Sequence, residues 1–235
     1  MGGVINFMPA YQNPGRENAN ECRTRLDVLI CPSDLSVTDA WRGQNNYVAN
    51  QGGWLCDRSD QPGAPGDNAP NERQTGVFYY LSKVKVSDIL DGTSHTAYFS
   101  EKIRGQGTPD PLSDMFVMPN QTSLETTYQQ CTDTNASTAT PLTSKYGYSW
   151  VMGENCCTLY NHVSTPNTNT CAGLPFPGTM TNMSMQVPPS SRHSGGVNVL
   201  MGDGAVRFVG TGVDLQVWRG LGTRSGKEQI SGTDY

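Results

Sequence analysis

The stretch Ser190–Gly210, SSRHSGGVNVLMGDGAVRFVG, predicts a β-hairpin near the end of the chain. Its centre is Asp203-Gly204, a pair that tolerates the positive φ angles of a two-residue type I′ turn. Pairing outward from this turn puts Val199 opposite Phe208, and residues then alternate with the period of two of a half-buried strand. The expected core face carries Val197, Val199, Met201, Val206 and Phe208. The expected wetter face carries Asn198, Leu200, Arg207 and Val209.

The histidine and the aspartate of this stretch suggest an acid–base pair, but their spacing argues against one. Nine residues separate His193 from Asp203. Strand residues that rise about 3.3 Å each place the two on the order of 25 Å apart. We therefore expect His193 to hydrogen-bond to loop backbone, with Gly195 and Gly196 starting the strand through a bulge or a tight bend. A binding or catalytic histidine is the alternative.

Composition favours a single loop-rich domain over residues 1–235 that binds neither nucleic acid nor a membrane surface. One β-rich domain commonly reaches this length, and a chain with 35% hydrophobic residues and 26 glycines is expected to have short elements. The net charge of -5 comes without a Lys/Arg cluster that would bind phosphate backbones or anionic lipid. No stretch approaches the roughly 20 apolar residues of a membrane-spanning helix, and no export signal precedes the first polar segment.

The remaining β structure is expected in four segments. They are residues 26–30, 45–55, 77–103 and 146–152. In the first, Leu26, Val28 and Ile30 share one face of a strand, and in the third, Asp91-Gly92 marks a turn. Residues 104–189 are otherwise expected to form a loop-rich, cysteine-containing insertion at the surface, pinned by disulfides.

Seven cysteines in polar, loop-like sequence indicate disulfides in an oxidising compartment. A zinc site, the alternative, would want paired C-x2-4-C knuckles or Cys/His pairs at ligand spacing. The odd number leaves at least one thiol unpaired, and Cys56 is our choice. The disulfide candidates are Cys22, Cys31, Cys131, Cys156, Cys157 and Cys171.

Two further groups of residues carry candidate chemistry. Ser94-His95 with Glu101 contains the residue types of a hydrolase relay, although a G-x-S-x-G elbow is missing and adjacent strand side chains point to opposite faces. Asp88, Asp91 and Glu101 offer hard oxygen ligands for Ca²⁺, although the D-x-D-x-D-G loop is absent. An ordinary turn is the alternative for these carboxylates.

The chain resembles a bacterial family of prepilin-like proteins, domain-of-unknown-function family 1559. HSGGVNVLMGDGAVRFV (193–209) matches the family's carboxy-terminal H-x9-DG motif. Further blocks occur in the family's order: LICPSD (29–34), NNYVANQGG (45–53), GVF (76–78), VSDILDGTSHTAYFSEK (86–102) and WRGLGTRSGKE (218–228). The similarity covers most of the chain apart from the cysteine-bearing middle.

This resemblance implies an α+β, β-rich, pilin-like plan, in which an antiparallel sheet covers the C-terminal half of an apolar N-terminal helix. We expect this chain to lack the family's helix, which inserts in the inner membrane, because the helix has been either truncated or lost. No catalytic residue comes with the resemblance. The motif residues are expected to be structural: His193, Gly195, Gly196, Asn198, Asp203, Gly204 and Arg207.

We therefore expect a non-enzymatic, extracellular or cell-surface subunit, pilin- or pseudopilin-like, of a type IV pilus or a type II secretion apparatus. Its partners would be other pilin-like subunits, and no cofactor is expected apart from a loop-bound Ca²⁺. The second hypothesis is a carbohydrate- or polymer-binding module, and the third is a secreted hydrolase built around His193 or His95. The aromatic candidates for the second are Trp41, Trp54, Tyr79, Tyr80 and Trp150.

Overall fold

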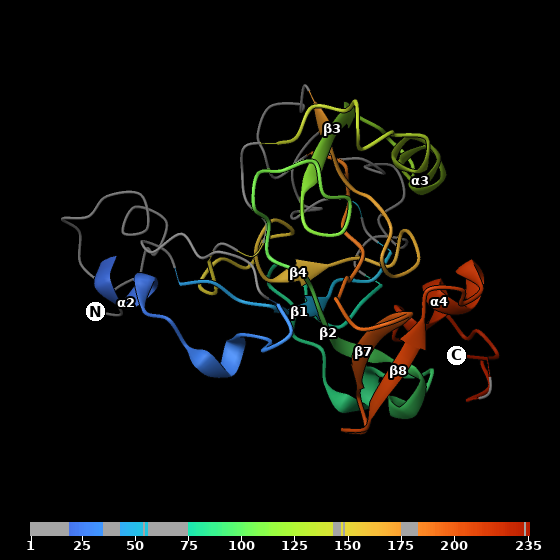
Figure 1. The fold of residues 1–235 in the computed structure, drawn as a ribbon. Helices are drawn as coiled ribbons and strands as arrows, with labels where there is room; N and C mark the ends of the chain where they lie inside the picture. The colour runs from blue at the N-terminus through green and yellow to red at the C-terminus, as the bar shows by residue number, and fades with distance from the viewer. Residues whose placement is uncertain are drawn as a thin grey trace.

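The fold consists of two β-sheets with short helices beside them (Figure 1). The computed structural model describes residues 19–34, 43–53, 55, 75–142, 147, 149–174, 183–232 and 234–235. One sheet has five strands and the other has three, so the expected α+β, β-rich class is confirmed. Within these residues, no helix has both the length and the apolar character needed to span a bilayer.

The five-stranded sheet has the order β4-β1-β2-β7-β8. Its strands are β1 (Tyr47–Asn50), β2 (Ala97–Glu101), β4 (Leu159–Tyr160), β7 (Gly196–Met201) and β8 (Val206–Gly210). The pairs β1–β2, β2–β7 and β7–β8 are antiparallel, and β4 pairs with β1 in parallel at the edge of the sheet. The strand expected within residues 45–55 and the C-terminal hairpin are therefore present. Of the expected β segment 77–103, only Ala97–Glu101 forms a strand, and residues 77–96 form turns and short 3-10 helices instead. The pairing brings together segments that are far apart in the sequence.

The β7–β8 hairpin forms, but its register differs by one residue from the expected one. Val199 pairs with Arg207 rather than with Phe208. The turn contains three residues, 202–204, and Gly204 adopts a left-handed φ of 87°. A three-residue loop that ends in a left-handed residue is the next most common hairpin connection after the two-residue turn. The two-residue turn predicted from Asp203-Gly204 is therefore wrong.

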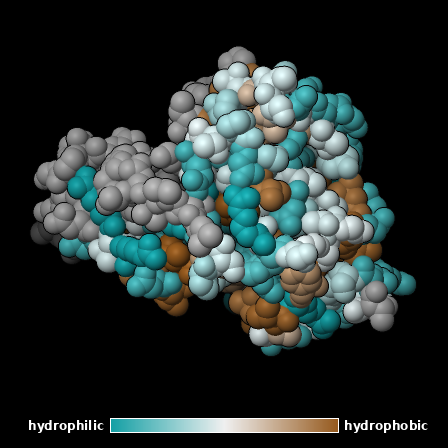
Figure 2. All heavy atoms as spheres, viewed as in Figure 1, coloured by the Kyte–Doolittle hydropathy of each residue, from teal (hydrophilic) through white to brown (hydrophobic). Residues whose placement is uncertain are grey.

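This shift exchanges the two faces of β8. Val206 and Phe208 were expected in the core, yet they are 66% and 49% exposed, whereas Val209 is fully buried. A one-residue slip has this effect because side chains alternate between the faces of a sheet. Hydrophobic residues gather on the lower part of the molecule in Figure 2, where the β7–β8 hairpin lies in Figure 1.

The second sheet comes from the segment that was expected to be a surface insertion. Its strands are β3 (Met115–Pro119), β5 (Thr170–Leu174) and β6 (Met185–Gln186), in the order β3-β5-β6. β3 and β5 are parallel, β5 and β6 antiparallel, and Phe116 and Met118 are buried. Residues 104–189 are thus not only loop. The apolar runs there are four or five residues long and lie between stretches rich in Thr, Asn and Pro, which dominate any window of composition.

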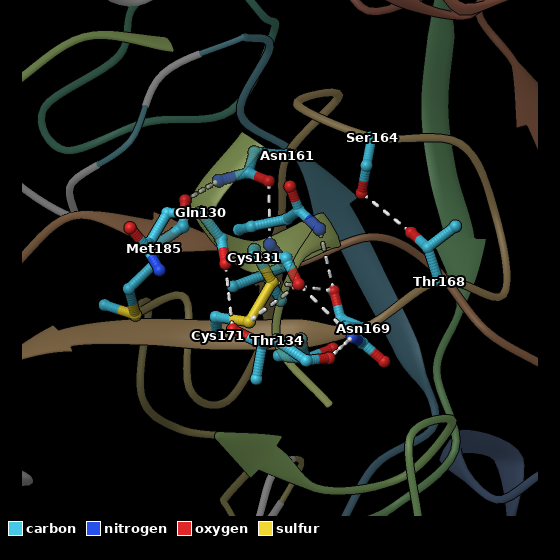
Figure 3. Close-up of a disulfide and its surroundings, with 12 residues drawn as sticks. Gln130, Cys131, Thr134, Asn161, Ser164, Thr168, Asn169, Cys171 and Met185 are labelled. Carbon is cyan, nitrogen blue, oxygen red and sulfur yellow. Dashed lines mark hydrogen bonds between the residues drawn. A yellow bond between two sulfur atoms is a disulfide. The ribbon is translucent and has the colours of Figure 1, made fainter. Parts of the chain in front are cut away.

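A disulfide between Cys131 and Cys171 joins α3 (Leu124–Thr132) to β5 (Figure 3). The Asn169 side chain donates to the carbonyl oxygens of Cys131 and Thr134 at 3.2 and 2.7 Å, which fixes the helix end over the strand. Of the candidate cysteines, only this pair is bonded in the structure. The disulfides expected for Cys22, Cys31, Cys156 and Cys157 are not formed. Cys56, our choice for the unpaired thiol, lies outside the described residues.

The main hydrophobic core lies between the two sheets and α4 (Leu215–Leu221). Trp218 of α4 is fully buried and stacks on His162, with ring centroids 4.1 Å apart. The two ring nitrogens of His162 lie 2.7 Å from the Trp218 carbonyl oxygen and 3.1 Å from the Tyr160 hydroxyl. Burial lowers the pKa of His162 to about 3, so the ring is neutral in the core. The five-stranded sheet contributes Val48, Ala97, Val197, Val199, Met201 and Val209 to this core.

Two expected strands are wrong. Within residues 26–30 the chain forms the 3-10 helix η1 (Asp27–Leu29), and Val28 is 81% exposed. Among the described residues no strand pairs with this segment, and alternating apolar residues form a strand only where a neighbouring strand pairs with them. The described part of residues 146–152 forms turns instead, with the Trp150 indole N–H donating to the Thr24 carbonyl. The remaining short helices are α2 (Ala19–Arg23), η2 (Val86–Asp88) and η3 (Thr93–His95).

Candidate functional site

One face of the five-stranded sheet is apolar and accessible, and we call it the open face. Register and alternation place on it Tyr47, Ala49, Phe99, Glu101, Asn198, Leu200, Val206 and Phe208. Tyr47 is 41% exposed, in addition to the two exposed residues of β8. The same strands turn their alternate residues into the core. The sheet is thus apolar on both faces, although an antiparallel sheet with one accessible face usually carries polar residues there.

A hollow of about 530 Å³ lies on the open face. Its apolar lining comes from the four adjacent strands β1, β2, β7 and β8 and includes Tyr47, Phe99, Leu200 and Val206. At one side the lining changes to the polar side chains of Cys31, Glu101, His193 and Asn198. A mainly apolar concavity with a few convergent polar groups is the usual form of a binding site.

Glu101, at the end of β2, is the centre of these polar groups. One carboxylate oxygen accepts hydrogen bonds from the backbone and side-chain N–H groups of Asn198, at 2.6 and 3.0 Å. The other lies 3.1 Å from Nε2 of His193. The carboxylate is buried, while the His193 side chain is 32% exposed. The H-x9-DG motif therefore supplies two residues, five positions apart, that hold one buried carboxylate.

Cys31 reaches the same place from the turn after η1. Its backbone N–H donates to the Asn46 side chain, which also donates to Asp34 at 2.6 Å and to the Lys102 carbonyl at 2.9 Å. Asp34 in turn forms a buried ion pair with Arg104, at 2.9 Å. A polar network with its charges paired fixes a backbone position firmly. The thiol of Cys31 is thus held beside the sheet by contacts that do not involve the thiol itself.

The three side chains of Cys31, Glu101 and His193 converge. Their sulfur, oxygen and nitrogen donor atoms all lie within 4.8 Å of one another. Burial raises the pKa of the Tyr47 phenol beside them, and negative charge on Cys31 and Glu101 raises it further. In a thiol relay, the histidine would hydrogen-bond to the thiol through one ring nitrogen and to an orienting group through the other. Here no hydrogen bond links Cys31 to His193, so the geometry is that of three donors around a common point.

The other motif residues make contacts within the hairpin and beside it. Gly195 has a φ of 85°, which favours glycine, and a Cβ on Gly196 would clash with the Val209 carbonyl oxygen. Asp203 accepts from the Ala205 N–H at 2.9 Å within the turn. Arg207 lies over the Tyr235 ring, 5.5 Å from its centroid. His193 and Asp203 have separate partners and do not form a pair.

The carboxylates considered for calcium are not gathered into one site. Asp88 accepts from the Lys85 N–H at 2.8 Å. Asp91 accepts from the backbone of Gly226 and Lys227, at 2.8 and 2.7 Å. Glu101 belongs to the cluster with Cys31 and His193. Each carboxylate thus has its own partners, and the first two hold turns.

The candidate relay of Ser94, His95 and Glu101, which the sequence argued against, is not assembled either. Ser94 Oγ lies 3.2 Å from Nδ1 of His95, but Glu101 is bonded to His193 instead. A second group of possible metal ligands joins Glu154 to the vicinal Cys156 and Cys157. In it the Cys156 sulfur lies 3.0 Å from that of Cys157 and 3.4 Å from a Glu154 oxygen.

The aromatic candidates are distributed over separate places. Tyr79 and Tyr80 line a hollow of about 490 Å³ together with Arg224. Trp150 packs elsewhere, with its backbone N–H bonded to the Gly43 carbonyl. Trp41 and Trp54 lie outside the described residues.

The convergence of Cys31, Glu101 and His193 was missed in the sequence. Each lies in a different block of the resemblance, LICPSD, the end of VSDILDGTSHTAYFSEK, and the start of the hairpin motif. Inspecting the blocks together for donor side chains would have found it. The partners of His193 are side chains rather than the expected loop backbone, since its backbone N–H donates to Ser191 Oγ and its ring lies 3.1 Å from a Glu101 oxygen.

By its fold and its site, this protein is a β-rich α+β domain. Its five-stranded sheet ends in an H-x9-DG hairpin and presents an apolar open face. Residues 5–216 match the model of the family described as "Protein of unknown function (DUF1559)", and the chain belongs to that family. A comparison with curated proteins finds no match. A comparison with solved structures also finds none.

Proposed function

We propose that this chain is a structural subunit without catalytic activity, pilin- or pseudopilin-like, of an extracellular or cell-surface assembly. The observation that carries the proposal is the apolar open face of the five-stranded sheet, on which Tyr47, Val206 and Phe208 are substantially exposed. Contiguous apolar patches on soluble domains are characteristic of interaction surfaces. The open face would be buried in the assembly.

The partner that fits the open face best is the apolar helix of a pilin-like subunit. Four strands spaced about 4.8 Å apart give a face roughly 14 Å wide, and an α-helix with its side chains is about 10–12 Å across. One helix therefore covers the face and seats its side chains in the hollow beside Phe99 and Leu200. The resemblance to prepilin-like proteins gives the same expectation, because the sheet of that plan covers an apolar helix.

A matched pair of charged substitutions tests the proposal. Val206 lies on the open face and Val86 on η2, and the two are similarly exposed, at 66% and 71%. Val206→Asp is expected to abolish incorporation of the subunit into assemblies isolated from producing cells, because a buried unpaired carboxylate is costly. Val86→Asp is expected to be incorporated normally. Incorporation and assembly are measured by immunoblotting of sheared surface material and by electron microscopy.

Two results would count against a structural subunit. One is native material that contains only dispersed monomers under all assembling conditions. The other is equal incorporation of both variants with unchanged thermal stability, which would show that the open face contacts nothing in the assembly.

A carbohydrate-binding role is the second candidate, favoured by the hollow beside Tyr79 and Tyr80. The Arg224 guanidinium lies 5.5 Å from the centroid of the Tyr79 ring, and Lys83 and Asp88 complete a charged rim. Aromatic surface with a few polar groups suits a small polar ligand. A glycan array is the test, and binding that disappears in Tyr80→Ala would support this role. An array without hits would remove it.

A further inference from the structure

We propose that Cys31, Glu101 and His193 bind a zinc ion at the polar side of the hollow on the open face. The three donor atoms lie within 4.8 Å of one another, although their residues are far apart in the sequence. The distance of 3.1 Å between Nε2 of His193 and the Glu101 oxygen is close to the ligand separation of a tetrahedral ion with bonds of about 2.0–2.2 Å. The site requires only that the three donor atoms come slightly closer together around a common ion.

The set of donors selects the class of metal. One thiolate, one imidazole and one carboxylate are the ligand types that Zn²⁺ accepts in four-coordinate sites. Calcium takes six to eight oxygen ligands and magnesium keeps several waters, so neither suits a site with sulfur and nitrogen. Zinc is therefore the ion to which this combination of residues points.

Charge balance favours the same ion. Cys31 and Glu101 carry two negative charges when the thiol has lost its proton, and His193 binds as a neutral ring. Two negative ligands neutralise a divalent cation, so the buried cluster has no net charge when it is loaded. The proton released by the thiol goes to solvent, and binding is therefore expected to weaken as pH falls.

Neighbouring groups hold two of the three ligands in place. Asn198 binds one oxygen of Glu101 from both its backbone and its side chain, and the second oxygen is left to face His193. Asn46 fixes the backbone of Cys31. Such outer contacts orient metal ligands and contribute to affinity. The partly exposed His193 is the ligand with freedom to close the site.

The fourth coordination position would face the hollow. Three protein ligands with an open position are the arrangement in which zinc holds a water or an external group. This inference does not rest on the proposed structural role, since the site is complete within one chain. A bound zinc ion would make the open face depend on metal.

The experiment is a metal titration of the purified full chain. We expect one equivalent of Co²⁺ to bind with a thiolate-to-cobalt charge-transfer band in the near ultraviolet, and Zn²⁺ to displace it. Zinc is also expected to slow alkylation of Cys31 in the unmodified protein but not that of Cys22, as measured by peptide mass spectrometry. This second readout needs no substitution and so does not depend on a variant folding.

Matched variants locate the metal. Cys31→Ser is expected to remove the charge-transfer band, and His193→Gln to weaken binding by at least about 10-fold, as loss of even an outer-shell partner does. Cys156→Ser and Cys22→Ser are the controls and are expected to retain the band. The proposal is overturned if no equivalent of metal binds, or if the band persists in Cys31→Ser and disappears in Cys156→Ser, which would place the metal at Glu154.

Discussion

The two faces of the five-stranded sheet both carry mainly apolar residues but differ in what covers them. On β8, Val209 is fully buried while Val206 is 66% exposed, although both are valines of one five-residue strand. The closed face packs against α4 and the second sheet, whereas the described elements leave much of the other face accessible. Strand alternation therefore identifies two faces, and only the tertiary cover decides which is core and which is available for binding.

The polar groups of the two faces also differ in whether they are enclosed by the fold or lie beside accessible space. On the closed face, Asn50 donates to the carbonyl oxygens of Ala97 and Gly222, at 2.7 and 2.9 Å, and so joins distant segments of the chain. On the open face, Glu101 and His193 meet at the wall of a hollow. Buried polar groups that bond only to backbone organise the fold, whereas those that converge beside accessible space are candidates for function.

The largest expected contrast between the faces comes from removing an aromatic side chain from each. Trp218→Ala is expected to lower the free energy of unfolding by about 3–5 kcal/mol, because a large fully buried ring leaves a cavity. Phe208→Ala, at a ring that is 49% exposed, should cost less than about 1 kcal/mol. Urea denaturation followed by circular dichroism measures both. Equal losses would show that Phe208 is covered in solution and would remove the distinction.

The second sheet closes one face, and the disulfide between Cys131 and Cys171 holds that sheet to α3. The two cysteines are 40 residues apart, and the chain-entropy model gives about 3–4 kcal/mol for a cross-link of that span. The double variant Cys131→Ser with Cys171→Ser is expected to lose stability of this order in urea denaturation. Cys22→Ser is the control for a buried thiol outside a disulfide. A reducing agent that destabilises the double variant as much as the native chain would contradict this assignment.

Acid should destabilise the closed face through His162. Its folded pKa of about 3 is below the ordinary value of 6.5, so between these values the unfolded chain binds the extra proton and stability falls as pH falls. By pH 5 the loss is roughly 2 kcal/mol. His162→Phe is expected to flatten this slope, whatever its stability at pH 7, and His95→Gln should keep it because His162 is intact. Chemical denaturation at pH 7, 6 and 5 supplies the slopes.

The sequence predicted the class and several strands, and the errors have a common physical origin. The hairpin was found because Asp203-Gly204 and the alternation of β7 are local features, while the register depended on whether the turn holds two residues or three. β3 and β5 were missed because they pair with each other across 55 residues of chain, so each short strand stood alone in sequence that has the composition of a loop. The cluster of Cys31, Glu101 and His193 was missed for a related reason, since three single residues become a site only through sheet pairing.

The smallest expected effect tests the turn that decides which β8 residues reach the open face. Gly204 has a φ of 87° and Gly212 has no positive φ, while a Cβ on either would meet no atom within 4 Å. Gly204→Ala is therefore expected to cost about 1 kcal/mol from backbone strain alone. Gly212→Ala is expected to be neutral or slightly stabilising, because it restricts only the unfolded chain.

A third substitution separates backbone strain from loss of the turn. Gly204→Asn should recover part of the cost, because asparagine visits the left-handed region more readily than alanine does. Urea midpoints of the three variants give the order Gly212→Ala, Gly204→Asn, Gly204→Ala from most to least stable. The same midpoint for both alanine variants would mean that residue 204 is not left-handed in solution. The three-residue turn and a two-residue type I′ turn both need a positive φ at residue 204. That result would therefore rule out the observed turn, and with it the register that puts Val206 and Phe208 on the open face.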